Sequence, residues 1–293
     1  MSGFKSFDNI STTDVAIVLY MIITAVFIIV FGGFKGEIII PLVIRIILLI
    51  SIGLIIYADT VLNNRGISFI HFFYPVLLLS YFYGETAQLN NYIFSSDLDA
   101  VFYGWEQWLF GFQPSIAFSV YFPQYWFSEL LHFGYFSYYL LTIGVSLVFY
   151  YQRPEIRDKV IFIIITSFLI YYLVFIIFPV VGPQYFFEPP LNEVANSGIF
   201  SRLVKLVQYY GEHPTGAFPS SHVGMVVIFL YLSFRNIRWL FILIVPLFAL
   251  ILMATVYVKA HYAIDVIAGL LSAPIVYYLC ILLYKLIKKE THN

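Results

Sequence analysis

Residues 159–181 read KVIFIIITSFLIYYLVFIIFPVV, a run of 23 residues in which Lys159 is the one charged side chain. About 20 apolar residues in a helix span the hydrocarbon core of a bilayer, so this run predicts a transmembrane helix. Further runs of the same kind lie at residues 14–34, 38–58, 67–83, 128–150, 219–235, 238–256 and 262–287. The sequence therefore predicts an all-α fold, a polytopic membrane helical bundle of about eight spans in one integral membrane domain, residues 1–293. Eight spans place both termini on one side of the membrane.

The composition supports a membrane protein. Hydrophobic residues make up 61% of the chain, aromatic residues 20% and charged residues 11%, which is far more apolar than a soluble domain. The net charge of -1 and the pI near 6.6 argue against a basic surface for nucleic acid, so we expect a membrane lipid as the partner. The single cysteine, Cys280, lies in the last apolar run and is interpreted as a packing residue. No small-residue cleavage site follows the first run, which is therefore interpreted as a retained anchor.

Two long segments connect the apolar runs. Residues 84–127 alternate aromatic and polar positions, a pattern typical of an amphipathic segment at the membrane interface. Residues 182–218 are rich in Pro and Gly and predict turns rather than regular structure. Loops on a rigid scaffold commonly shape substrate sites. We expect residues 14–84 to form N-terminal spans and residues 97–287 to form the catalytic core.

The basic residues predict the orientation, because loops rich in Lys and Arg tend to stay in the cytoplasm. One set of loops and termini holds Lys5, Arg65, Arg153, Arg157, Lys159, Arg235, Arg238, Lys285, Lys288 and Lys289. The opposite set holds Lys35, Arg202, Lys205 and Lys259. The termini are therefore predicted to be cytoplasmic. The poorer set faces the periplasm if the membrane is a bacterial inner membrane, or the lumen if it is a eukaryotic endomembrane.

Two histidine motifs lie at the ends of apolar runs on that outer side. The first reads AFPSSH, residues 217–222, and places Ser220 and Ser221 before a predicted helix. Hydroxyls and free N–H groups at a helix N-terminus form an anion-binding position, which suits a phosphate. The second motif is HYAID, residues 261–265, in which positions i and i+4 share a helix face, so that Asp265 can orient His261.

These residue types are suited to phosphoryl transfer. An oriented imidazole at His261 is a nucleophile for phosphorus, and His222 on the same surface can protonate the leaving oxygen. This scheme needs no metal and no cofactor. Positive groups offset phosphate charge, and the candidates on the outer side are Lys259, Lys205, Arg202 and His213.

At these motifs the sequence resembles the type 2 phosphatidic acid phosphatase superfamily, whose pattern includes P-S-G-H and S-R-x-x-x-x-x-H-x-x-x-D. The matching residues are His222, His261 and Asp265. The Ser-Arg pair of the family is replaced by Ala254 and Thr255, and the upstream K-x-x-x-x-x-x-R-P motif is missing. The chain therefore lacks two of the cations that the family pattern carries.

A closer resemblance is to the branch that contains inositol phosphorylceramide synthases and related inositolphosphotransferases. It is carried by residues 109–115, 135–139, 178–185 and 261–265. The resemblance implies a phosphohistidine at His261 and transfer of a phospho-head group to a lipid alcohol. It also implies phosphate contacts from Gln184 and Tyr185. With water as the acceptor, the same residues give a lipid phosphate phosphatase acting on phosphatidic acid or an isoprenyl phosphate.

Two other classes of function stay open. His222, His261 and Asp265 have the residue types of a three-ligand zinc site with an open position. The same polar cluster in a transporter or flippase binds substrate or relays protons.

Several other residues have structural interpretations. His71 and His132 lack a catalytic context and are expected to have structural roles. Arg45 lies within the second apolar run, where its guanidinium either snorkels to the surface or pairs inside the bundle, and we expect snorkelling. Lys259 is equally suited to a phosphate contact and to anchoring at lipid head groups.

Overall fold

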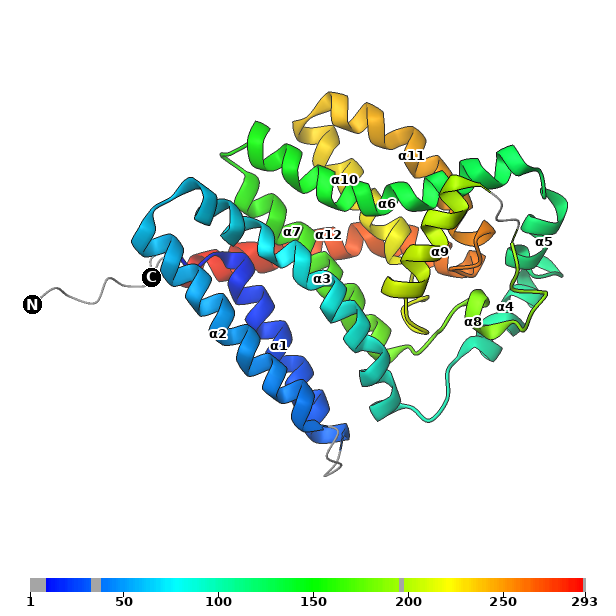
Figure 1. Ribbon diagram of the computed structural model, residues 1–293, viewed down its shortest axis with the longest axis horizontal. Coiled ribbons are helices and arrows are strands. Elements are labelled where there is room, and N and C mark those ends of the chain that lie inside the picture. Colours follow the sequence, from blue (N-terminus) through cyan, green and yellow to red (C-terminus); the bar gives the residue numbers. More distant parts are fainter. Residues whose placement is uncertain (1–8, 33–37, 195–197, 292–293) are drawn as a thin grey trace, which may run out of the picture.

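The computed structural model describes residues 9–32, 38–194 and 198–291, and within these ranges every regular element is a helix (Figure 1). Lys5 and Lys35, used above for orientation, lie outside the described residues. The all-α prediction is confirmed.

Seven of the described helices are long and apolar enough to cross a membrane. They are α1 (Thr12–Phe31), α2 (Ile39–Leu62), α3 (Arg65–Ile93), α6 (Tyr125–Gln152), α7 (Arg157–Ile177), α11 (Arg238–Tyr257) and α12 (Ala263–Thr291). The other predicted span, residues 219–235, is α10 (Ser221–Asn236), whose 16 residues rise only about 24 Å. Seven of the eight predicted runs are thus helices of spanning length, and the eighth is a shorter helix.

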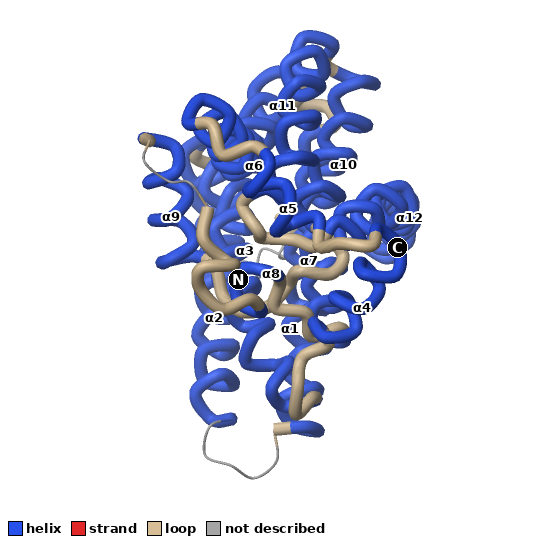
Figure 2. The backbone as a smooth tube through the Cα atoms, turned by 90° about the vertical axis from the view of Figure 1, so that its right-hand side faces the viewer, coloured by secondary structure: helices blue, strands red, loops and turns tan. Residues whose placement is uncertain are grey.

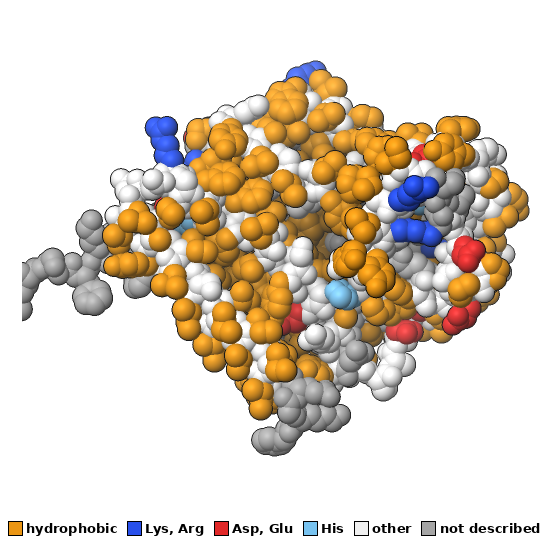
Figure 3. Space-filling view, viewed as in Figure 1, with side chains coloured by type: hydrophobic (Ala, Val, Ile, Leu, Met, Phe, Trp, Pro, Cys, Tyr) orange, Lys and Arg blue, Asp and Glu red, His pale blue; other side chains and the backbone are white. Residues whose placement is uncertain are grey.

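The most buried of these helices is α7, which packs against α1, α3, α10 and α12. Figure 2 shows α7 in the middle of the bundle, between α1 and α2 on one side and α10 and α11 on the other. An all-round apolar sequence is what such a central helix requires. On the face shown in Figure 3, hydrophobic side chains cover the middle, and most visible acidic side chains gather at the end that holds α4, α5 and α8.

The segment 84–127, expected to be amphipathic and interfacial, is largely helical. It contains the end of α3, then α4 (Asp99–Phe110) and α5 (Pro114–Tyr121). The exposed rings of Trp105 and Trp108 agree with an interfacial position, whereas Asp99 and Glu106 on the same helix are buried. α4 therefore presents its carboxylates to the interior of the protein.

The prediction of turns alone for residues 182–218 is wrong. The segment contains α8 (Pro183–Phe186) and the 13-residue helix α9 (Ile199–Gly211). The N-terminus of α9 is capped from a distant helix, since Glu129 on α6 accepts hydrogen bonds from the backbone N–H groups of Phe200 (2.9 Å) and Ser201 (3.0 Å). A cap supplied from 71 residues away leaves no local signal in the sequence.

Arg45 does not snorkel. Its side chain is buried and forms a bidentate ion pair with Glu85 of α3, at 2.7 and 2.8 Å, and also donates to Thr24 of α1. The helix α3 continues ten residues beyond the predicted limit at 83, and two of the polar residues that lower its hydropathy have partners inside the bundle: Glu85 pairs with Arg45, and Asn90 is hydrogen-bonded to Thr215. Cys280 is buried against Ser167, as expected of a packing residue.

Candidate active site

The two histidines of the sequence motifs are in direct contact. His222 lies in the first turn of α10, and His261 lies in the turn between α11 and α12. Nδ1 of His222 is 3.1 Å from Nε2 of His261, a hydrogen-bond distance between residues 39 positions apart. The fold therefore brings the two predicted imidazoles into one site.

The orientation of His261 is set by a backbone carbonyl. Its Nδ1 is 2.7 Å from the oxygen of Ala217 and 3.7 Å from Oδ2 of Asp265. A carbonyl only accepts, so Nδ1 carries the proton and Nε2 presents its lone pair. The expected hydrogen bond from the ring N–H of His261 to Asp265 is not formed, because Oδ2 accepts from the backbone N–H of Tyr262 at 2.7 Å instead.

The pKa of His261 favours the nucleophilic form. Burial lowers this pKa to about 4, which outweighs the opposing effects of the Ala217 hydrogen bond and the nearby Glu212 carboxylate. The imidazole is therefore neutral at neutral pH. A neutral Nε2 with a free electron pair is the form that attacks phosphorus.

Two carboxylates of α4 hold the loops that surround His261. Asp99 accepts from the backbone N–H groups of Val181 (2.7 Å) and Gly182 (2.9 Å), and Glu106 accepts from that of Ala263 (2.5 Å). Burial raises the pKa of Asp99 and raises that of Glu106 to about 7. Neither residue was predicted to lie in the site, although acidic residues in an aromatic-rich segment are a usable signal.

The predicted anion-binding serines have different roles. Ser220 is buried, and its hydroxyl caps α10 by accepting from the N–H of Val223 at 3.4 Å. Ser221 instead lines a small cavity together with His222 and His261. Of the two hydroxyls, that of Ser221 is the one in position to meet a substrate.

The predicted cations are not among the described residues that line this cavity. Lys259 is 1% exposed, and its Nζ is held by the hydroxyl of Ser119 (2.8 Å) and the carbonyl of Glu193 (3.0 Å). Burial lowers the pKa of Lys259 to about 8. Lys205 is an exposed residue of α9. The Lys259 amine is thus bound to groups inside the protein. It is free neither to contact a phosphate nor to anchor at lipid head groups.

Glu212 is a site residue that was not predicted from the sequence. Its carboxylate accepts from the hydroxyls of Tyr135 (2.5 Å) and Tyr139 (2.9 Å) and from Nε2 of Gln184 (2.9 Å). Glu212, Tyr135 and Gln184 all line the cavity of the histidines, whereas Tyr185 does not. Three neutral donors, including the predicted Gln184, therefore converge on the carboxylate oxygens of Glu212.

The cavity at the histidines is nearly closed. Its volume is about 20 Å³, roughly the space of one water molecule, and Nε2 of His222 is buried without a hydrogen-bond partner in the described structure. The ring of His222 lies between aromatic neighbours, with its centroid 5.0 Å from that of Tyr135 and 4.2 Å from that of Tyr138. A phosphate ester fits only after the surrounding segment moves.

The three residues proposed as zinc ligands do not form a ligand set in the described structure. No group of three His, Cys, Asp or Glu side chains among the described residues has an arrangement that holds a metal ion. Oδ2 of Asp265 accepts a hydrogen bond from the backbone N–H of Tyr262, and Nδ1 of His222 faces Nε2 of His261. The hydrogen-bonding arrangement thus favours an imidazole pair over a metal centre.

The family model of the PAP2 superfamily matches residues 101–279, more than half of the chain. The chain belongs to the PAP2 superfamily. No curated protein and no solved structure matches it. The superfamily is one of phosphatases and phosphotransferases, so the chain is a membrane enzyme of this general kind. The match starts in α4 and ends in α12, so it includes both histidines and leaves out α1, α2 and α3.

Proposed function

We propose that the protein transfers the phospho-head group of a membrane lipid to a lipid alcohol through a phosphohistidine at His261. The observation that carries the proposal is the imidazole pair, in which His261 has its Nδ1 proton committed to Ala217 and its Nε2 directed at His222. A nucleophile and a proton donor are thus adjacent in a water-poor site, the arrangement that covalent phosphoryl transfer requires.

The first half of the reaction forms a phosphorus–nitrogen bond. Nε2 of His261 attacks phosphorus, and the ester bond to the departing lipid alcohol breaks. The alcohol oxygen takes a proton from the adjacent His222, which enters the step protonated on both ring nitrogens and leaves it neutral. The proton on Nδ1 of His261 stays on that nitrogen and is donated to the Ala217 carbonyl, which stabilises the positive charge that develops on the ring. No redox change and no further reactant is involved.

The second half reverses these roles. The acceptor hydroxyl attacks phosphorus, its proton returns to His222, and the phosphorus–nitrogen bond breaks to release neutral His261. An alcohol acceptor gives a new lipid phosphodiester, whereas water gives hydrolysis.

The donors around Glu212 support a place for the phosphate oxygens. Tyr135, Tyr139 and Gln184 now donate to a carboxylate, which resembles a phosphate in charge and in accepting geometry. When the Glu212 side chain moves away, these three donors can form hydrogen bonds with the phosphate oxygens of the substrate. Asp265, capping the start of α12, holds the backbone next to His261 rather than the ring itself.

The charge of the site favours a diester over a monoester. The described residues lining the histidine cavity include no Lys or Arg, while Glu212 adds a negative charge. A phosphomonoester carries up to two negative charges and a diester carries one, so the diester is repelled less. The resemblance to inositolphosphotransferases at residues 178–185 and 261–265 supports the same choice, with phosphatidic acid phosphatase activity as the alternative.

We further propose that the site faces the periplasm or the lumen. The start of α1 and the end of α12 pack together, away from α4, α5 and α8, which lie at the end of the site (Figure 1). Loops at the termini's end hold more Lys and Arg than loops at the site's end, which supports cytoplasmic termini.

A trapping experiment tests the reaction. Purified protein in detergent with a chelator receives phosphatidylinositol labelled in its head group, is quenched in alkali, and is digested for mass spectrometry. We expect label on His261 that disappears from His261→Gln, and a new phosphoinositol lipid when ceramide or diacylglycerol is added. Release of phosphate from phosphatidic acid, with no transfer product, would instead establish the phosphatase. Turnover by His261→Gln at the wild-type rate would remove the mechanism altogether.

A further inference from the structure

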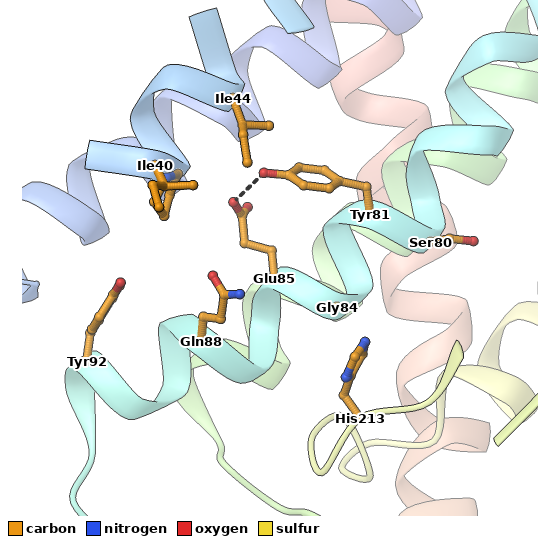
Figure 4. A pocket seen from close by; sticks show the side chains of 10 residues that line it. Ile40, Ile44, Ser80, Tyr81, Gly84, Glu85, Gln88, Tyr92 and His213 are labelled. Carbon is orange, nitrogen blue, oxygen red and sulfur yellow. Dashed lines mark hydrogen bonds between the residues drawn. The ribbon is translucent and has the colours of Figure 1, made fainter. Parts of the chain in front are cut away.

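A second, larger cavity lies between α2 and α3. Its volume is about 640 Å³, against about 20 Å³ at the histidines. Ile40, Pro41 and Ile44 form its wall on α2. In Figure 4, Tyr81, Glu85 and Gln88 extend from α3 toward the isoleucines of α2, and His213 rises from its loop toward Gly84. The cavity thus combines an apolar wall with a row of polar groups, as lipid-binding sites do.

The charges beside this cavity are already compensated. Both oxygens of Glu85 accept from the Arg45 guanidinium, and Oε1 also accepts from the hydroxyl of Tyr81 at 3.1 Å. Arg45 is further committed to Thr24 and to backbone carbonyls. No Lys or Arg is among the described lining residues, so the cavity offers no free cation to a phosphate head group.

The remaining polar groups are neutral donors and acceptors. The side chains of Gln88 and Tyr92 form no hydrogen bond within the described part of the chain. An amide and a phenol of this kind suit a hydroxyl or amide head group. The adjacent Ile40 and Ile44 suit hydrocarbon chains.

A single layer of residues separates the two cavities. Tyr83 of α3 lines the histidine cavity together with Glu212, and the next residues along each segment, Gly84 and His213, line the larger cavity. A Cβ atom at Gly84 would lie 3.0 Å from Nε2 of His213, so a glycine lets the imidazole approach this closely. The displacement of Glu212 that admits a phosphate to His261 therefore also moves the partition between the cavities.

We propose that the cavity between α2 and α3 binds the acceptor, an uncharged lipid alcohol, and delivers its hydroxyl to the phosphohistidine when residues 212–213 move. This assignment rests on the proposed transferase function. It places acceptor selection in α2 and α3, outside the region that matches the family, while the matched region performs the chemistry.

Photolabelling tests the site without depending on turnover. Full-length protein in detergent is irradiated with a photoactivatable diacylglycerol, and labelled peptides are mapped by mass spectrometry. We expect labels on α2 and α3 around Ile44 and Gln88, competed by unlabelled diacylglycerol or ceramide and not by phosphatidic acid. Ile44→Trp fills the cavity and is expected to lower this labelling at least fivefold. Ile47→Trp, the same change at an exposed position of α2 outside the cavity, is the matched control.

The possible results separate this proposal from the proposed function. Equal labelling of the two tryptophan variants, or equal competition by phosphatidic acid, overturns the acceptor site. In a transfer assay, Ile44→Trp is expected to raise the KM for the acceptor about tenfold relative to Ile47→Trp. Loss of labelling in Ile44→Trp with unchanged acceptor KM also overturns it. If wild-type protein consumes no donor, the proposed function is wrong. The photolabelling result alone then decides whether the cavity binds a lipid alcohol.

Discussion

The molecule contains two buried histidine clusters that satisfy their hydrogen bonds in different ways. In the N-terminal helices, Nδ1 of His71 is 2.8 Å from Asp59 and Nε2 is 3.0 Å from Asp14, so both ring nitrogens donate to carboxylates. In the family-matched region, His261 donates to a carbonyl, and its other nitrogen faces His222, whose Nε2 has no partner in the described structure. A fully satisfied cluster binds helices together, whereas an incompletely satisfied one keeps capacity for a substrate.

The carboxylates differ as well. Asp14 also accepts from Tyr74 and Asp59 also accepts from Ser68, which links α1, α2 and α3 at the end opposite the active site. Asp99 and Glu106, near His261, accept mainly from backbone N–H groups and have no cation among their described partners. The N-terminal cluster is therefore suited to stability and the core cluster to chemistry.

The largest expected effect is the loss of enzyme activity when the histidine of the core cluster is replaced. His261→Ala removes the nucleophile and is expected to lower kcat by on the order of 10⁴-fold or more. Its Tm is expected to stay within about 3 °C of wild type, because only a few buried contacts are lost. The measurement is head-group transfer by purified protein, normalised to folded protein. A His261→Ala variant with wild-type turnover would make the core cluster as structural as the N-terminal one.

The second prediction tests the other side of the comparison. His71→Ala leaves Asp14 and Asp59 buried without their shared partner and is expected to destabilise the protein by about 3–5 kcal/mol. Turnover per folded molecule is expected to be within about threefold of wild type. Thermal unfolding in detergent measures the first quantity. The control is His132→Ala, which removes the contacts of Nδ1 with the carbonyl and the hydroxyl of Ser128 but leaves no charge unpaired, and is expected to cost about 1–2 kcal/mol. Equal losses in the two variants would contradict a binding role for the N-terminal cluster.

The sequence was sufficient for the helices and for the histidine pair, because hydropathy is read over about 20 consecutive residues and the motifs lie within single short segments. It was insufficient where partners are distant. The Glu85 carboxylate that keeps Arg45 buried is 40 positions away, and the Glu129 cap of α9 is 71 positions away. Glu212 had no local signal, since its donors come from α6 and α8.

A third, smaller effect concerns the charge of the core site. Glu212→Gln removes a negative charge from the donors Tyr135 and Tyr139 and is expected to lower the KM for phosphatidic acid about tenfold. The KM for phosphatidylinositol is expected to fall less, so the ratio of monoester to diester cleavage rises. Steady-state kinetics with both lipids measures the ratio. Glu193→Gln, an exposed carboxylate of the same outer loop, is the control. An unchanged ratio in Glu212→Gln would show that the carboxylate does not face the substrate.

The smallest effect is a pH dependence of stability that originates in the core cluster. Burial raises the pKa of Glu106 from its ordinary value of 4.5 to about 7. Between these values the folded state holds a proton that the unfolded state has released, so the free energy of unfolding falls as pH rises through this window. The contribution is complete below pH 4.5 and lost above about pH 7. Glu106→Gln keeps a neutral side chain at every pH, and its unfolding curves in detergent are expected to change less than those of wild type between these limits. Parallel curves for the two proteins would mean that Glu106 is ionised in the folded protein. The contrast between Asp14 and Asp59, which pair with His71, and Glu106, which is bound by backbone N–H groups, would then not hold.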